Sequence, residues 1–216
     1  MLLAKTYTPA PIFFSLPTPS IYAEATAVMT ADRLIKQAQS GDSAAISQLY
    51  ELHVDAIYRY ILYRVPTNHD AEDLTAEVFL SMVKDLPNYQ WTGAPFEAWL
   101  YRIAAARIAD FYRQSKRRAD VELHEDLTDG LPRIEQQLLD NEEIEALKEV
   151  IQQLSSGDQT VLILRFIERK SHKEVAQIMG KSPAAVKAMQ HRALTHLATL
   201  LGSEDKVRHY LRGQDD

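Results

Sequence analysis

Near its C-terminal end, the sequence contains a stretch that predicts two short helices joined by a tight turn. Ser171 and Glu174 have the spacing of a capping box, in which the hydroxyl and the carboxylate each accept an unpaired backbone N–H. Gly180 stands where the first helix must end in a left-handed residue. Ser182 then supplies an N-cap, and Pro183 occupies the first helical position, where its missing N–H costs nothing. This pattern predicts a helix-turn-helix.

The second of these helices has an apolar face and a polar face. A helix-turn-helix with this layout can place its second helix in a DNA major groove. The alternative is a surface helical hairpin within an all-α domain, and the rest of the chain has to decide between the two. Lys187, His191 and Thr195 lie opposite Val186, Ala193, Leu197 and Leu201, with Gln190 and Arg192 at the flanks.

Composition limits the classes of protein to which this chain can belong. The 216 residues are enough for one large or two small domains, and no apolar run is long enough to span a bilayer. The chain has no cysteine, which excludes disulfides and thiolate-bound metal centres and fits a reducing cytoplasm. The formal net charge of −6 argues against a nucleic-acid partner only if the charges are evenly distributed.

The positive charges are concentrated in one segment. Between Trp99 and Arg118 the only acid is Asp110, and aromatic residues are interleaved with the basic ones. Single-stranded nucleic acid is bound by this combination, because cations follow the phosphates and rings stack on unpaired bases. The alternative for each single ring is a place in the core. The basic residues are Arg102, Arg107, Arg113, Lys116, Arg117 and Arg118, and the aromatic ones are Tyr89, Trp91, Trp99, Tyr101, Phe111 and Tyr112.

Helical periodicity divides the chain into two domains. Residues 30–118 and 141–201 carry apolar residues at helical spacing, and an acidic linker lies between them at 119–140. Residues 1–29 are proline-rich and predict a disordered or weakly ordered extension, whose apolar run is too short for a signal peptide. Met29 is a second possible start, and residues 202–216 form a charged tail. No strand-type alternation is sustained, so the predicted fold class is all-α.

Start and stop signals place the individual helices. Each expected helix begins at a capping residue or a proline-bounded loop and ends at a glycine, a proline or a polar turn. The first domain is expected to contain helices at 31–38, from Asp42 to Val65, from 68–70 to Leu86 and over 96–118, and the second domain helices at 144–154 and 159–168 before the helix-turn-helix.

The third expected helix begins with an acidic surface. Asp73 and Glu77 are four residues apart and project together, and Phe79 is expected outside the inner stripe at Leu74 and Val78. Acids early in a helix are also expected from the helix dipole alone. A carboxylate metal site would need a second cluster, and the histidines have no recognised ligand spacing. No phosphate loop or nucleophile motif occurs either, so an enzyme is disfavoured and no cofactor or metal is expected.

Together these segments resemble the sigma-70 family of bacterial transcription initiation factors, in particular the extracytoplasmic-function (ECF) group. DAEDLTAEVF is similar to the family's helix that binds core polymerase, and PFEAWLYRIAAARIADFYRQSKRR is similar to its promoter-melting and −10 helix. LSSGDQTVLILRFIERKSHKEVAQIMGKSPAAVKAMQHRAL resembles region 4 nearly throughout. The resemblance implies a region 2 at 30–118 and a region 4 at 141–201.

The resemblance also implies three contact surfaces. The clamp helices of the largest subunit of RNA polymerase would bind the acidic helix, with the flap as a further polymerase contact. A flipped-out −10 base would enter the loop after that helix, and the −35 element would lie against the helix-turn-helix. The implied residues are Asp70, Asp73, Leu74, Glu77, Val78 and Phe79 for polymerase; Asn88, Tyr89, Gln90, Trp91, Arg102, Arg107, Arg113, Lys116, Arg117 and Arg118 for −10 DNA; and Lys173, Ser182, Ala184, Lys187, Gln190, His191 and Arg192 for −35 DNA.

Three positions depart from the family pattern. Ala76 replaces a frequent Gln, Ala105-Ala106 replaces a basic or polar residue followed by Asn, and Met189 stands where many members have Arg. The family further implies an anti-sigma partner and no membrane insertion. A stand-alone DNA-binding regulator is the alternative, but it leaves the acidic and the basic–aromatic helices without a role. A helical enzyme or nucleotide-handling protein would need a pocket constellation that the sequence lacks.

The linker is long enough for a chain that binds two promoter elements. Elements about two and a half helical turns apart are separated by roughly 85–90 Å, at about 34–36 Å per turn. The linker at 119–140 can extend to about 70 Å at roughly 3.3 Å per residue, and the widths of the two domains supply the rest. Its acids would share the charge sign of RNA in a basic polymerase channel.

Overall fold

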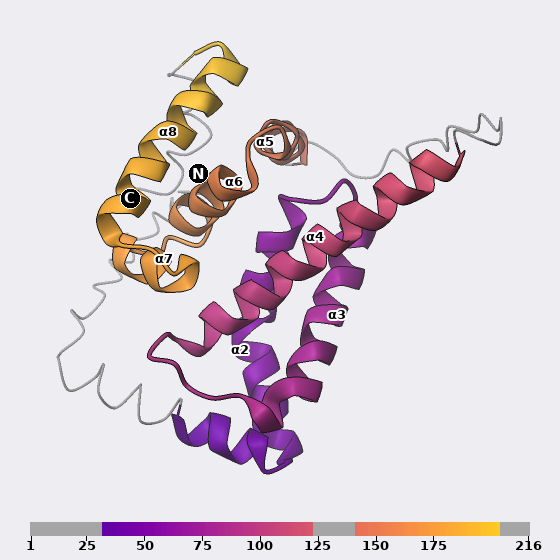
Figure 1. The fold of residues 1–216 in the computed structure, drawn as a ribbon, viewed down its shortest axis with the longest axis vertical. Helices are drawn as coiled ribbons and strands as arrows, with labels where there is room; N and C mark the ends of the chain where they lie inside the picture. The colour runs from indigo at the N-terminus through magenta and orange to yellow at the C-terminus, as the bar shows by residue number, and fades with distance from the viewer. Residues whose placement is uncertain (1–31, 123–140, 204–216) are drawn as a thin grey trace, which may run out of the picture.

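A computed structural model describes residues 32–122 and 141–203, which form two helical domains (Figure 1). Those residues contain no strand, which confirms the all-α fold class. The predicted extension at 1–29, most of the predicted linker and nearly all of the predicted tail lie outside the described residues. The first domain contains helical residues 32–39, α2 (Ser43–Leu62), α3 (Asn68–Asp85), the 3₁₀ turn η1 (Leu86–Asn88) and α4 (Phe96–Glu122), and the second contains α5 (Asn141–Gln152), α6 (Ser156–Leu162), the π-helical turn η2 (Ile163–Ile167), α7 (His172–Met179) and α8 (Pro183–Leu201).

Side-chain caps fix the starts of the helices in the first domain. The Asp42 carboxylate accepts the N–H groups of Ala44 and Ala45, at 2.9 and 3.3 Å, and α2 begins directly after it. Thr67 and Asp70 form a reciprocal capping box at the start of α3. Such caps satisfy backbone donors that have no partner within the helix, so they determine where each helix begins.

The core of the first domain lies between α2, α3 and α4. These helices bury the apolar stripes that the sequence predicts, and each fully buried Leu or Ile side chain contributes about 1.5–3 kcal/mol relative to an exposed one. The buried residues of these stripes are Leu49, Ile57 and Ile61 of α2, Leu74, Val78 and Met82 of α3, and Phe96, Leu100, Ala104 and Ile108 of α4.

Two helices differ from their predicted form. α4 continues to Glu122, four residues into the predicted linker, because no glycine or proline interrupts it there. The helix predicted at 159–168 begins earlier, at Ser156, because Ser155 caps it by accepting the N–H of Asp158 at 3.2 Å. It then widens into the π-helical turn η2, in which the N–H of Glu168 donates to the carbonyl of Ile163 at 2.9 Å.

The predicted helix-turn-helix is confirmed in each of its signals. The N–H of Ser171 donates to Glu174 Oε2 at 2.7 Å, and the N–H of Glu174 donates to Ser171 Oγ at 3.2 Å. This hydrogen bonding lowers the pKa of Glu174, against the opposing effect of partial burial. Gly180 ends α7 at φ 62°, and Ser182 caps α8 by accepting the N–H of Ala185. The turn between the two helices is therefore held at both sides.

The two domains pack against each other along α4. In Figure 1, α5 to α8 are gathered on one side of α4, α3 lies on the other side, and α2 passes behind α4. α7 packs on α4, and η2 packs on α2. The second domain thus meets the first through two of its three long helices.

Candidate nucleic-acid interface

The acidic surface of α3 is exposed at two of its three predicted acids. Asp73 and Glu77 project into solvent one turn apart. Asp70 is half-buried, and its carboxylate accepts the N–H of Thr67 at 3.2 Å and its hydroxyl at 2.6 Å. The structure therefore uses Asp70 as a helix cap, whereas Asp73 and Glu77 stay exposed beside basic neighbours, with His69 Nε2 3.5 Å from Asp73 and Arg107 Nε 3.9 Å from Glu77.

The apolar residues predicted to bind polymerase are buried instead. Phe79 is only 5% exposed, and its ring packs edge-on against Tyr50 with the centroids 4.8 Å apart. The expectation that Phe79 lies outside the inner stripe is wrong, because α2 covers a second side of α3. Leu74 and Val78 are buried in the same core. These three side chains support α3 and do not face a partner.

An exposed apolar rim on α3 was not predicted. Leu80 is 71% exposed, and Val83 is also exposed, as is Tyr50 on the facing helix α2. Val83 and Tyr50 border a shallow hollow whose floor includes Phe79. Leu80 lies one turn after Glu77, so the acids and the rim form one continuous surface. The sequence does carry a signal for it, since Leu80 falls outside the predicted inner stripe.

The loop between η1 and α4 presents one aromatic ring and buries another. Trp91 is 67% exposed, whereas Tyr89 turns inward and its ring lies 4.7 Å from that of Trp99. Burial raises the pKa of Tyr89, and nearby Arg102 opposes this rise. Gln39 holds the loop by donating to the carbonyl oxygen of Tyr89 at 2.7 Å. The predicted stacking surface is thus reduced to Trp91, with Asn88 and Gln90 exposed beside it.

Most of the other aromatic residues of α4 are packed in the core, which was the alternative to stacking on bases. Tyr101 is buried and faces the second domain, while Trp99 and Phe111 are half-buried against the first. The Tyr112 ring is exposed, but its hydroxyl donates to the carbonyl of Arg64 at 2.7 Å. The prediction that α4 binds nucleic acid therefore depends on its basic residues.

The basic residues of α4 fall into two groups. Arg102, Lys116 and Arg117 are exposed, and the side chain of Arg118 lies outside the described residues. Arg107 is half-buried and donates to Ser81 Oγ at 2.7 Å, so it ties α4 to α3. Arg113 is exposed but paired with Asp110 one turn earlier.

α8 presents most of its predicted DNA-contacting residues to solvent. Gln190 is the exception, because it is half-buried and its Oε1 accepts a hydrogen bond from Arg165 Nε at 3.0 Å. Arginine only donates, so the amide oxygen must face it. Gln190 consequently anchors α8 to η2, although the sequence placed it at the flank of the DNA face. Ser182 is exposed but serves as the N-cap of α8. The other exposed residues of the predicted −35 set are Lys173 on α7 and Ala184, Lys187, His191 and Arg192 on α8.

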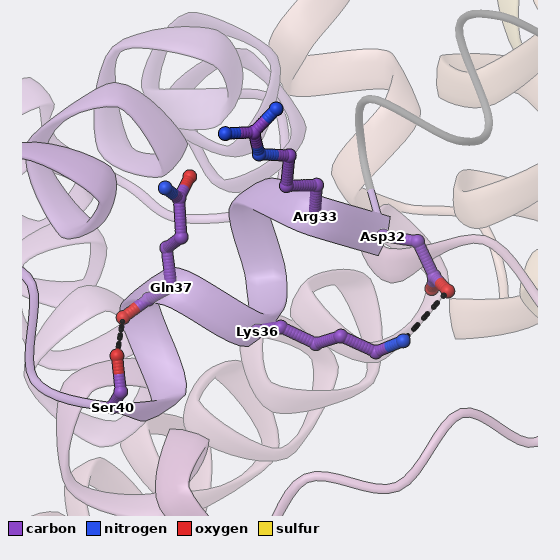
Figure 2. Close-up of a pocket in the computed structure, with 5 residues that line it drawn as sticks. All are labelled: Asp32, Arg33, Lys36, Gln37 and Ser40. Carbon is purple, nitrogen blue, oxygen red and sulfur yellow. Dashed lines mark hydrogen bonds and ion pairs between the residues drawn. The ribbon is translucent and has the colours of Figure 1, made fainter.

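A shallow hollow on the first helix carries no chemistry of its own. Figure 2 shows that its lining residues all come from one helical segment, with the Lys36 Nζ atom 3.7 Å from Asp32 and Ser40 donating to the carbonyl of Gln37. Within residues 32–122 and 141–203, no group of three or more His, Cys, Asp or Glu could hold a metal ion. In the same part of the chain, no helix is long and apolar enough to cross a membrane.

Comparison with known proteins identifies both domains. The family model for Sigma-70 region 2 matches residues 49–118, and the model for Sigma-70, region 4 matches residues 144–197. The ECF RNA polymerase sigma factor ShbA of Streptomyces griseus is 34% identical over 77% of this chain and 93% of its own length. The chain belongs to the ECF sigma factors. Sigma factors direct RNA polymerase to promoters, and a stand-alone regulator does not account for the region 2 match.

Two further relatives agree with this assignment. The ECF sigma factor BldN of Streptomyces coelicolor is 36% identical over 78% of this sigma factor, and the match spans 64% of the length of BldN. The structure of CnrH, a sigma factor of Cupriavidus metallidurans, in complex with the cytosolic domain of CnrY has a TM-score of 0.60 and 25% identity. It covers 80% of this sigma factor and 97% of the CnrH chain.

Proposed function

We propose that this sigma factor contacts core polymerase through α3, −10 DNA through the loop at 88–95 together with α4, and −35 DNA through α8. Each contact is made by the exposed subset of the residues implied by the family resemblance. The buried members of that set, such as Phe79 and Gln190, hold the contact surfaces in place.

The observation that carries the proposal is the exposed ring of Trp91 on an anchored loop. A tryptophan that is 67% exposed loses the stabilisation of burial, yet Gln39 fixes the loop that presents it. An unpaired base can stack on this ring while Arg102 and the end of α4 bind the adjacent phosphates. Stacking of an extruded base offsets the free energy of unpairing, so melting needs no ATP.

The α3 surface fits a partner that is both basic and apolar. Asp73 and Glu77 supply negative charge, and Leu80 adds an apolar side chain one turn further along the same face. Charge complementarity of this kind favours fast association and a single orientation, while the apolar contact adds to the affinity. The clamp helices of polymerase are the partner that we assign to this surface.

α8 combines charge with short side chains on its exposed face. Lys187 and Arg192 are placed to bind phosphates, and His191 is placed to reach base edges. Ala184 leaves the start of the helix free to approach the groove floor closely. Since Met189 is half-buried, it does not replace the arginine that many family members carry at this position.

The partners follow from the same assignment. CnrH is seen in complex with CnrY, and we propose that an anti-sigma protein binds this sigma factor as well. The polymerase carries out RNA synthesis, so the sigma factor itself contributes no catalytic residue. It acts where the polymerase acts, in the cytoplasm.

Run-off transcription with bacterial core polymerase on a genomic promoter library tests the proposal. The wild-type chain should yield discrete new transcripts that share −35 and −10 motifs. Trp91→Ala should still form closed complexes but lose open ones, at a cost of about 1–3 kcal/mol for one stacked base. Leu52→Ala, which removes another strongly exposed apolar side chain, serves as the control and should leave open complexes unchanged. Absence of promoter-specific starts, or normal melting by Trp91→Ala, would contradict the proposal.

A further inference from the structure

We infer that the helix at 32–39 belongs to the −10 site, and that Gln39 on this helix is the positioning residue for the loop that carries Trp91. The inference concerns the −10 contact and therefore rests on the proposed function. The match to Sigma-70 region 2 begins at residue 49, so the helix lies before the matched segment. It contributes no residue to the set that the family resemblance implies for DNA or polymerase. Its role follows from two hydrogen bonds and from the way the loop is packed.

The Gln39 side chain joins this helix to the segment that follows α3. Its Nε2 atom donates to the carbonyl oxygen of Leu86 at 3.1 Å and to that of Tyr89 at 2.7 Å. The amide nitrogen of glutamine carries two hydrogens, so both donors are used here. The carbonyl of Leu86 also accepts the N–H of Tyr89, at 3.0 Å. One side chain thus holds both sides of η1, where α3 ends and the loop begins.

The helix that carries Gln39 is itself held in place. Ile35 and Ala38 of this helix are buried. Directly after the helix the chain turns at Gly41, whose φ of 88° is one that glycine adopts without steric cost, and its N–H donates to the carbonyl of Ala38 at 3.0 Å. Figure 1 shows the helix, in indigo, beside the end of α3 and the loop that leads to α4. Gln39 is therefore presented from a fixed helix, as accurate positioning of a loop requires.

The loop itself contributes few contacts that could hold Trp91 in place. In the part of the chain that the structure describes, residues 90–94 make no hydrogen bond through their backbone groups. The nearest fixed points are Tyr89 before them and Pro95 after them, whose carbonyl accepts the N–H of Ala98 at 2.9 Å. Trp91 follows Tyr89 by two positions, so their Cα atoms lie at most about 7 Å apart, at about 3.6 Å per residue. Fixing Tyr89 therefore restricts where the Trp91 ring can be presented.

Tyr89 is held from two sides, and the helix at 32–39 supplies one of them. Its ring packs against Trp99 and Phe96 of α4, with centroid distances of 4.7 and 5.3 Å. Its carbonyl oxygen is held by Gln39. Without Gln39 the ring contacts would remain, but the carbonyl would be free to turn. The peptide plane that leads toward Trp91 would turn with it.

Anchoring of the loop should favour promoter melting, because it lowers the cost of ordering Trp91. A group that is already ordered before contact loses less conformational freedom on binding. Gln39 should therefore affect open complexes, in which the extruded base stacks on the ring. It should not affect closed complexes, in which that base is still paired. Binding to polymerase and to the −35 element should not depend on Gln39 either.

Open-complex formation with core polymerase tests the inference. Gln39→Glu keeps the shape of the side chain, but its carboxylate has no hydrogen to donate to the two carbonyl oxygens. It should lower the ratio of open to closed complexes about tenfold, the combined size of two net hydrogen bonds, while closed complexes form normally. Gln39→Ala, which adds no charge, should show a similar loss. Gln37→Glu is the matched control, because Gln37 is exposed on the same helix and receives the same charge.

Two further readouts separate positioning of the loop from a general loss of structure. In a Trp91→Ala background, Gln39→Glu should cause no further loss of open complexes, since the ring that it positions is absent. In a Trp99→Phe background Trp91 is the only tryptophan, and its fluorescence anisotropy should decay faster once Gln39→Glu is added. Equal losses with and without the Trp91 ring, or unchanged anisotropy, would overturn the inference. Failure of the wild-type chain to confer promoter-specific starts would overturn the proposed function instead and leave the anisotropy unaffected.

Discussion

At the scale of single residues, His53 shows how burial can make a stable fold sensitive to acid. Its ring on α2 lies 5.7 Å from that of Phe96, and burial lowers its pKa. Glu97 opposes this shift, and Lys170 adds to it. Unfolded His53 titrates near 6.5, so below that pH the unfolded chain binds more protons than the folded one. The free energy of unfolding therefore falls as the pH drops from about 6.5 toward the lowered pKa of the folded state.

A glutamine at this position should remove that part of the pH dependence. The wild-type chain is expected to lose up to about 1.4 kcal/mol per pH unit from this single proton. His53→Gln has no proton to take up and should show a flatter profile between pH 7.5 and 5.5. Urea unfolding at a series of pH values measures the difference, with the exposed His69→Gln as the control. Equal slopes for wild type and His53→Gln would contradict the prediction.

At the scale of elements, the helix-turn-helix separates residues that position α8 from residues that bind DNA. Gln190→Ala removes one of the hydrogen-bond partners of Arg165 and should lower the melting temperature while leaving the sequence preference for −35 DNA unchanged. Lys187→Ala should leave the melting temperature unchanged, weaken binding to all sequences, and reduce the salt slope of binding by about 1. Thermal unfolding and binding at several salt concentrations distinguish the two. If Gln190→Ala changed the base preference, the prediction would be contradicted, and Gln190 would have to be counted among the residues that contact DNA.

The helices themselves were largely predictable, because their signals are local. Ser171, Gly180 and Pro183 act on backbone groups within a few residues, so spacing alone located α7 and α8. Local spacing did not predict whether a residue at the edge of a helix's apolar face points into the core or toward solvent. Phe79 is covered by α2, and Gln190 is taken by Arg165 from a π-helical turn that no local pattern indicated. Which side of a helix is buried depends on neighbours that are distant in sequence.

At the scale of the whole molecule, the contact between the domains was not predictable from the sequence. Arg59 and Glu168 are 109 positions apart, and Arg64 and Ser156 are 92 apart. Each of them is an ordinary polar residue on a helix or in a turn, where charges are common. Tyr101 was grouped with the DNA-facing aromatics for the same reason, yet it is buried on the side that faces the second domain. Only the packing of complete domains assigns these residues to an interface.

That packing should couple the unfolding of the two domains in a way that depends on salt. At low ionic strength the ion pairs at Glu168 and Lys170 are at full strength, so loss of one domain removes partners from the other. Calorimetry of the full chain should then show one transition or two overlapping ones. In about 0.5 M salt the screening length falls to a few ångströms, and two separated transitions are expected. Arg59→Glu should show the separated pattern already at low salt, whereas a separation equal in both salts would mean that the domains unfold independently.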